Sequence, residues 1–309
     1  MGCDGSPAAC PFEGEDLTLW RPPAPVRPAP VGEGKSPPAT VPPRIIVVAN
    51  EKGGAGKSTV AALLSTAMLY QGVRVAVMDV DLRQQTLSNF LANRRRWLPA
   101  AKVSAPVPLE FKLADDPADL AEADPARVVS LFHKALVLAT GSADIVVIDT
   151  PGGDTPLSRA AHLQADIVVT PMNDSFVDFD MLGKIDPITL KLVRPSLYAR
   201  VVHDARRTRA GYGRKLDWVV LRNRMALTEG RNRQRVTVNL EQLADQVGFR
   251  LGPPLRERIA YREMFPFGLT LADLSANLRP AEISTPRKAA REELNALLVA
   301  LNLIEQSEP

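Results

Sequence analysis

Cysteine is scarce in this chain, and both cysteines lie close to its start. Only Cys3 and Cys10 occur among the 309 residues. The rest of the chain therefore offers no pair for a disulfide and no thiolate ligands for a zinc or iron–sulfur site. Such a composition fits a reducing compartment, so we expect a cytoplasmic protein.

Long apolar runs and regularly spaced histidines are also missing. No apolar run approaches the roughly 18 residues that a bilayer-spanning helix needs. The chain does not start with the basic and apolar segments of a signal peptide. The three histidines show no ligand spacing, and they are His133, His162 and His203. These absences predict a protein that does not enter the membrane, and they give the histidines no role.

Composition divides the chain into two parts. Residues 1–43 are rich in Pro, Gly and Ala and have no periodic apolar pattern, which is typical of a disordered tail. Residues 44–309 carry the periodic pattern. With 45% hydrophobic and 24% charged residues, the chain can bury a full α/β core. We expect one domain over 44–309.

A glycine-rich loop at residues 50–59 follows the β-branched run 45–48 and precedes a helix-like segment over 60–70. Glycines let backbone N–H groups close around phosphate oxygens, and the dipole of the next helix favours the same anion. Lys57 would reach the β- and γ-phosphates of a nucleotide, and Ser58 would ligate Mg²⁺. The predicted nucleotide-binding residues of the loop are Lys52, Gly53, Gly54, Ala55, Gly56, Lys57, Ser58 and Thr59.

Glu51 departs from the pattern G-x-x-x-x-G-K-[ST], because it stands where the first glycine is expected, and Lys52 follows it. A lysine at the mouth of the loop cannot easily fold back onto its own phosphates. Its natural reach is towards a nucleotide held by a second subunit. The sequence K-G-G-A-G-K-S-T resembles the deviant Walker A loop of the ParA/MinD superfamily, whose members dimerise around two ATP molecules. The resemblance implies catalytic roles for Lys52 in trans and for Lys57 in cis.

Carboxylates follow two predicted buried strands. The strand at 73–78 leads into Asp79 and Asp81, and the strand at 145–148 ends in Asp149, which is the Walker B pattern. Ligands of open parallel sheets bind at the carboxyl ends of the strands, so we expect Asp149 to meet Mg²⁺ directly or through water. The resemblance implies that Asp81 positions or activates the attacking water. A helix is expected over 83–97, and the alternative role for Asp81 is to cap the start of this helix.

Further stretches narrow the resemblance to the MipZ family of division-positioning ATPases. They lie at 79–84, 171–183, 218–224 and 261–270, and the similarity covers about residues 44–303. ParA-like proteins carry an adenine-binding asparagine at the end of a strand. The predicted strand 218–221 is followed by Asn223, so the resemblance implies that Asn223 reads the base. A turn asparagine is the alternative.

A basic block spans residues 200–235, where eleven Lys or Arg stand against three acidic residues. Such a block suggests an acidic polymer as partner. Its second half would form a strip that binds DNA phosphates without sequence preference when two subunits meet. A solvated helix face is the alternative. The predicted DNA-binding residues are Arg222, Arg224, Arg231, Arg233 and Arg235.

Strands that alternate with helices predict a doubly wound, mostly parallel sheet with helices on both faces. The last predicted helix, about 287–304, has glutamates beside its apolar stripe, so we expect it to pack on the domain and to bind no membrane. The resemblance implies a slow regulatory ATPase that uses ATP and Mg²⁺ and forms a homodimer with ATP. Its implied partners are DNA, ParB and FtsZ, and its implied location is the nucleoid, enriched towards the cell poles.

Two alternatives stay open. A ParA-type chromosome, plasmid or cargo partition ATPase would share every phosphate-site residue and differ only in its partner. A metabolic enzyme on the same scaffold is the other. A dethiobiotin-synthase-like ligase needs a second substrate pocket that the sequence does not locate, and a nitrogenase iron-protein relative needs cysteines that the chain lacks beyond Cys10. A tyrosine-kinase relative is disfavoured, because no tyrosine cluster lies near the C-terminus.

Overall fold

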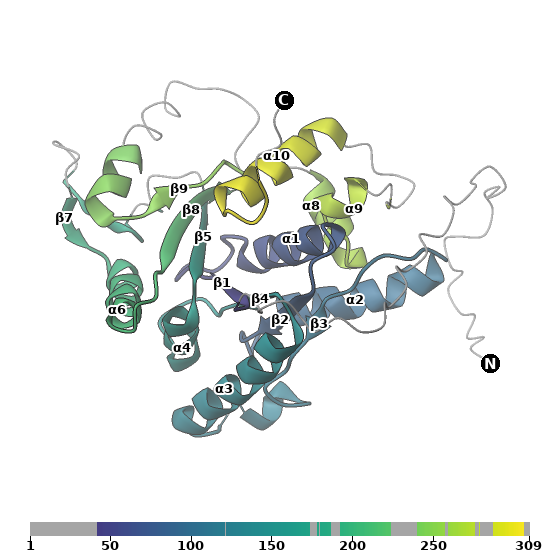
Figure 1. Cartoon of the computed structure of the whole chain (residues 1–309), viewed down its shortest axis with the longest axis horizontal. Coiled ribbons are helices and arrows are strands. Elements are labelled where there is room, and N and C mark those ends of the chain that lie inside the picture. The colour runs from purple at the N-terminus through teal and green to yellow at the C-terminus, as the bar shows by residue number, and fades with distance from the viewer. Residues whose placement is uncertain are drawn as a thin grey trace, which may run out of the picture. The chain divides into compact units, whose positions relative to one another are not determined.

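The computed structural model describes residues 42–120, 122–173, 178, 180–186, 192–223, 240–256, 259–275, 278 and 287–305. The predicted tail lies almost entirely outside these residues, and so does the helix expected to begin near residue 229. Figure 1 shows the arrangement of the described elements.

A seven-stranded sheet of parallel strands forms the centre of the described part, in the order β3-β2-β4-β1-β5-β8-β9. The prediction of a doubly wound parallel sheet is confirmed. Each central strand is a run of apolar, mostly β-branched residues, as expected for strands buried on both faces. The strands are β1 Arg44–Val48, β2 Val75–Asp79, β3 Leu109–Glu110, β4 Ile145–Asp149, β5 Ile167–Asn173, β8 Asp217–Asn223 and β9 Arg250–Leu251, and a separate antiparallel pair joins β6 Gly183–Ile185 to β7 Leu192–Pro195.

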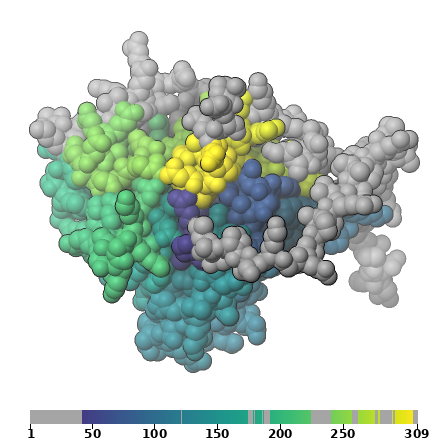
Figure 2. Space-filling model, viewed as in Figure 1, coloured from purple at the N-terminus to yellow at the C-terminus, as the bar shows by residue number. Residues whose placement is uncertain are grey.

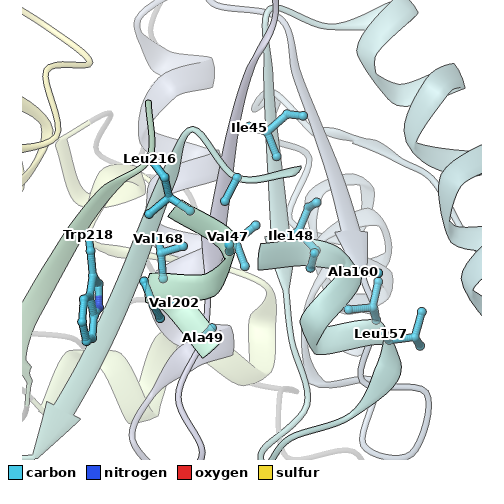
Figure 3. Close-up of a cluster of buried hydrophobic side chains, with 14 of the residues drawn as sticks. Ile45, Val47, Ala49, Ile148, Leu157, Ala160, Val168, Val202, Leu216 and Trp218 are labelled. Atoms are coloured by element: carbon cyan, nitrogen blue, oxygen red, sulfur yellow. The ribbon is translucent and has the colours of Figure 1, made fainter. Parts of the chain in front are cut away.

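Two layers of helices cover the two faces of this sheet (Figure 1). Alternate residues of one strand enter different layers. Val47 faces the layer of α3, α4 and α6, and Val48 faces the layer of α1 and the C-terminal helices. Figure 3 shows the first of these layers around Val47, Val168 and Trp218. The helices are α1 Lys57–Tyr70, α2 Thr86–Ala100, α3 Pro125–Ser142, α4 Pro156–Gln164, α6 Leu197–Gly211, α8 Ile259–Met264, α9 Leu271–Ser275 and α10 Arg287–Ala300, with short 3₁₀ turns at Pro117–Leu120 and Phe265–Phe267.

The C-terminal helix packs on the domain, as predicted from its flanking glutamates. Leu294, Leu297 and Leu298 of α10, and Leu301 just after it, are buried in the same apolar layer as α1 and α9. Figure 2 shows α10, in yellow, at the surface next to α1. None of the helices in the described ranges is both long and apolar enough to cross a membrane.

A buried ion pair joins α2 to α9. Arg94 on α2 donates two hydrogen bonds to Asp273, at 2.8 and 3.1 Å, and a third to the carbonyl of Gly268, at 2.8 Å. Gly268 has φ +70°, and a Cβ there would lie 2.2 Å from the backbone nitrogen of Arg94. Tyr70 at the end of α1 donates to Asp273 as well, at 2.7 Å. The stretch 261–270, which contributed to the family resemblance, therefore packs on α2 with a glycine at its closest approach.

Candidate nucleotide-binding site

The glycine-rich loop leaves β1 at the carboxyl edge of the sheet and leads into α1. Gly54 has φ +75° and Gly56 has φ +91°, a region that residues with a Cβ rarely adopt. Gly56 is the N-cap of α1. The first N–H groups of α1 have no partners within the helix, so they are available to an anion held by the loop. The structure therefore has the loop–helix geometry that the sequence predicted.

Lys57, the first residue of α1, lies between the loop and the acidic groups. Its side chain is almost entirely buried, and its ammonium donates to the backbone carbonyl of Lys52 at 3.3 Å. Burial lowers the pKa of Lys57, while the nearby charges of Asp149 and Asp81 act in the opposite direction. This amine is placed to meet phosphates cradled by the loop.

Two carboxylates lie side by side below the loop. Asp149 at the end of β4 pairs in register with Asp79 at the end of β2, so the two side chains share one face of the sheet. Asp149 is fully buried, and among the described residues neither of its carboxylate oxygens has a hydrogen-bond partner. Burial, and then the charge of Asp79, raise the pKa of Asp149 well above its ordinary value, and the Ser58 hydroxyl and Lys57 oppose this shift.

Asp79 has partners that Asp149 lacks. It accepts from the backbone N–H groups of Asp81, at 3.1 Å, and Ser88, at 3.0 Å. Burial nevertheless raises the pKa of Asp79 to about 6. The side chain thus ties the start of α2 to the acidic edge of the sheet.

Asp81 caps a turn ahead of α2. Its Oδ1 accepts from the backbone N–H groups of Arg83, at 3.3 Å, and Gln84, at 3.0 Å. The helix itself begins three residues later than predicted, at Thr86, after Gln85 with φ +46°. The turn occupies only one carboxylate oxygen. Its geometry agrees with the capping alternative and is compatible with a role in orienting water.

The residues present fit a magnesium ion. Mg²⁺ in nucleotide sites takes one or two protein oxygens and completes its octahedron with phosphates and water. The partnerless oxygens of Asp149 and the adjacent Ser58 hydroxyl supply such oxygens. No group of three or more acidic, histidine or cysteine ligands exists in the described part of the chain, so an all-protein cage is not what these residues form.

Lys52 lies at the mouth of the loop. Its backbone N–H donates to the side chain of Asn50 at 2.7 Å, and its ammonium forms an ion pair with Asp178 of the same chain at 2.7 Å. The lysine side chain is 38% exposed. Within one chain, the ammonium of Lys52 therefore lies against Asp178, which follows β5.

Asn223 is the last residue of β8, and it contacts the loop. Its amide Nδ2 donates to the carbonyl of Ala55 at 2.8 Å, and a Cβ on Gly56 would lie 2.2 Å from that nitrogen. Asn223 thus ends a strand and does not lie in a turn. Base reading by Asn223 stays a prediction.

The predicted basic strip is described only at its start. Arg222 lies within β8 and is 8% exposed, a burial that fits poorly with a direct contact to DNA phosphates. Arg224, Arg231, Arg233 and Arg235 lie outside the described residues. A strip of this kind would therefore depend on those four arginines.

Sequence reasoning gave no specific role to two groups that the fold brings to the site: Asp79 pairs with Asp149, and Asp178 holds Lys52. Gly152 belongs to the Pro-Gly-Gly sequence after β4, which predicts a segment that senses the γ-phosphate, and it approaches the phosphate loop. A Cβ on Gly152 would lie 3.3 Å from the carbonyl of Glu51 and 3.7 Å from the ammonium of Lys57. The Pro-Gly-Gly sequence signalled a special loop, and an acidic residue at each of two adjacent strand ends signalled the pair. No sequence signal pointed to Asp178.

The sheet order, the loop after β1 and the carboxylate at the end of β4 give this chain the fold of the P-loop ATPases of the ParA/MinD class. The family model of the ATPase MipZ matches residues 44–305, so this chain belongs to the MipZ family.

Relatives and solved structures agree with this assignment. Protein ParA of Rhizobium radiobacter is 25% identical over 232 residues, which make up 75% of this chain and 86% of that protein. Chromosome partitioning protein ParA of Caulobacter vibrioides is 30% identical over 179 residues, 51% of this chain and 66% of that protein. The ATP complex of McdA from Cyanothece superposes with a TM-score of 0.59 at 18% identity, over 86% of this chain and 99% of that chain.

We expect Mg²⁺ to strengthen nucleotide binding at pH 7.5 and to lose this effect below about pH 6. The raised pKa values of Asp79 and Asp149 mean that protons compete with the cation, by up to about tenfold per pH unit for one displaced proton. The measurement is the affinity for ADP with and without Mg²⁺ at pH 5.5 and 7.5. Asp149→Asn is the control and should show little Mg²⁺ effect at either pH. An equal Mg²⁺ effect at both pH values in the unaltered protein would contradict the assignment.

Proposed function

We propose that this ATPase is a switch in which ATP bridges two copies of the chain. The observation that carries the proposal is the position of Lys52 at the mouth of the loop, where its side chain is partly exposed and its ammonium pairs with Asp178. Lys57 would bind the phosphates in cis, and Lys52 would stabilise the nucleotide of the other subunit. Ser58 and Asp149 would hold Mg²⁺, which supplies charge neutralisation between the phosphates.

Hydrolysis would return the switch to its starting state. Asp81 is held by its own turn beside the acidic edge, which suits a group that orients a water molecule against the γ-phosphate. The backbone of Gly152 lies close to the carbonyl of Glu51 and the ammonium of Lys57. A γ-phosphate bound there would therefore contact the loop that contains Gly152, as in switch loops. ATP would favour the dimer because it contacts both subunits, and a slow reaction would set the lifetime of that state.

The dimer model gives Lys52 a test of its own. Lys52→Ala should abolish dimerisation with ATP while nucleotide binding persists, because the phosphates keep Lys57 and the loop backbone. Light scattering behind size-exclusion chromatography, with a non-hydrolysable ATP analogue, measures the effect. Lys134→Ala is the matched control, because it removes an exposed lysine from α3. Unchanged dimerisation of Lys52→Ala would remove the trans role.

Family membership suggests the partners of the dimer. MipZ-type function implies non-specific DNA binding on the nucleoid, recruitment by ParB towards the cell poles and inhibition of FtsZ polymerisation. Two copies of the basic segment beyond β8 would supply a positive strip for DNA.

The DNA strip can be tested through its salt dependence. Replacing Arg224, Arg231 and Arg233 together with Ala should weaken DNA binding and flatten the slope of log affinity against log salt, by about 0.9 for each lost phosphate contact. The control is the pair Arg200→Ala and Arg207→Ala, which removes exposed arginines from α6. An unaltered salt slope in the triple variant, or an equal loss in the control, would refute the strip.

A partition ATPase of the ParA type is the second candidate, favoured by the ParA relatives. The two functions differ in the partner and share the phosphate site. Purified FtsZ assembled with GTP should sediment less when the ATP-loaded protein is added, and the ADP-loaded protein should have little effect. FtsZ sedimentation that is the same with both nucleotides would favour partition of a different cargo.

A further inference from the structure

Just before the phosphate loop, the buried carbonyl of Ala49 is hydrogen-bonded to a tyrosine from a distant part of the chain. Ala49 is 1% exposed, and its carbonyl accepts a hydrogen bond from the hydroxyl of Tyr198 at 2.9 Å. Tyr198 is the second residue of α6 and is 3% exposed. Its hydroxyl enters from the sheet face opposite α1 and reaches Ala49, the residue just before the loop.

The tyrosine is itself part of a chain of hydrogen bonds. Trp218 Nε1 lies 3.0 Å from Thr170 Oγ1, and Thr170 Oγ1 lies 2.7 Å from the Tyr198 hydroxyl. An indole nitrogen only donates and a carbonyl only accepts. The direction is therefore fixed: Trp218 donates to Thr170, Thr170 donates to Tyr198, and Tyr198 donates to Ala49. Each hydroxyl in this chain donates once and accepts once.

Ala49 is tied to its surroundings on its other side too. Its N–H donates to the carbonyl of Val169 at 3.0 Å. The next residue, Asn50, donates to the carbonyl of Pro171 at 2.5 Å and accepts from the N–H of Lys52. The root of the loop is thus fixed to β5 and to α6 before the first glycine is reached.

We propose that Tyr198 is a positioning residue that sets the phosphate loop in its binding conformation through the carbonyl of Ala49. The loop can bind phosphate tightly only if its N–H groups already converge, because ordering them at the moment of binding costs affinity. The inference rests on the proposed nucleotide binding and adds a residue outside the loop to it.

The test compares Tyr198→Phe with Tyr70→Phe, because the hydroxyl of Tyr70 also donates a hydrogen bond but lies away from the loop. Tyr198→Phe removes one hydroxyl and leaves the Ala49 carbonyl without its partner. We expect about a tenfold weaker affinity for Mg²⁺–ADP, measured by calorimetry, and the same loss for inorganic pyrophosphate. ADP avoids the dimerisation that ATP would bring. Tyr70→Phe, which loses the bond to Asp273, should lower the thermal unfolding midpoint and leave both affinities unchanged.

Thr170 gives a graded second test that does not need a folded Tyr198→Phe protein. Thr170→Val removes the donor to Tyr198 but keeps the bond to Ala49, so we expect a twofold to threefold weaker affinity. Thr170→Ser keeps the hydroxyl and should bind like the unaltered protein.

The possible outcomes separate the two proposals. If the unaltered protein binds neither Mg²⁺–ADP nor pyrophosphate, the proposed function fails. If it binds both and Tyr198→Phe binds them equally well, only the positioning role is overturned. A loss of ADP affinity without a loss of pyrophosphate affinity also overturns it, because the effect would then act on the base or ribose. Should Tyr198→Phe not fold, equal affinities of the two Thr170 variants overturn it.

Discussion

In-register pairing of parallel strands decides where the polar groups of this site lie. Val48 at the end of β1 pairs with Asp149 on β4, and Asp149 pairs with Asp79 on β2. Parallel strands end at a common edge, so the loop that leaves β1 emerges beside both carboxylates. The register is strongly specified because both faces of the sheet are buried, and a slip by one residue would turn every side chain to the wrong layer. The apolar layers thus fix the geometry of the site before any ligand binds.

The same pairing creates an electrostatic conflict at the strand ends. Two carboxylates share a buried edge, and burial raises the pKa of both. The charge of Asp79 adds to the shift at Asp149, and the charge of Asp81 adds to the shift at Asp79. The buried ion pair of Arg94 and Asp273 is a contrast, since every side-chain nitrogen of Arg94 and both carboxylate oxygens of Asp273 have hydrogen-bond partners. The oxygens of Asp149 receive no such compensation among the described residues. Buried like charges without full compensation are typical of functional sites, and we propose that a cation binds at this edge.

The phosphate loop depends on contacts from far along the chain. Asn50 holds the loop to β5, Tyr198 supports its first carbonyl from α6, and Asn223 holds the carbonyl of Ala55 from β8. Lys52 is held by Asp178, just beyond β5. Elements that follow the loop by more than a hundred residues therefore set its shape. A partner that moved α6 or the residues after β5 would act on a bound nucleotide through this loop.

The local sequence pattern was sufficient to predict those parts of the structure that depend only on neighbouring residues. The β-branched run ending at Val48, the glycines at positive φ and the apolar strand ending in Asp149 predicted the strands, the loop and the acidic edge from neighbouring residues alone. The start of α2 at Thr86 was missed by three residues, because Asp79 and Asp81 draw the preceding N–H groups into a turn. The burial of Arg222 and the contact between Asn223 and Ala55 followed only from tertiary structure, as did the pairing of Lys52 with Asp178. Each of these joins groups more than a hundred residues apart or depends on what packs over a strand, and only the folded chain brings such groups together.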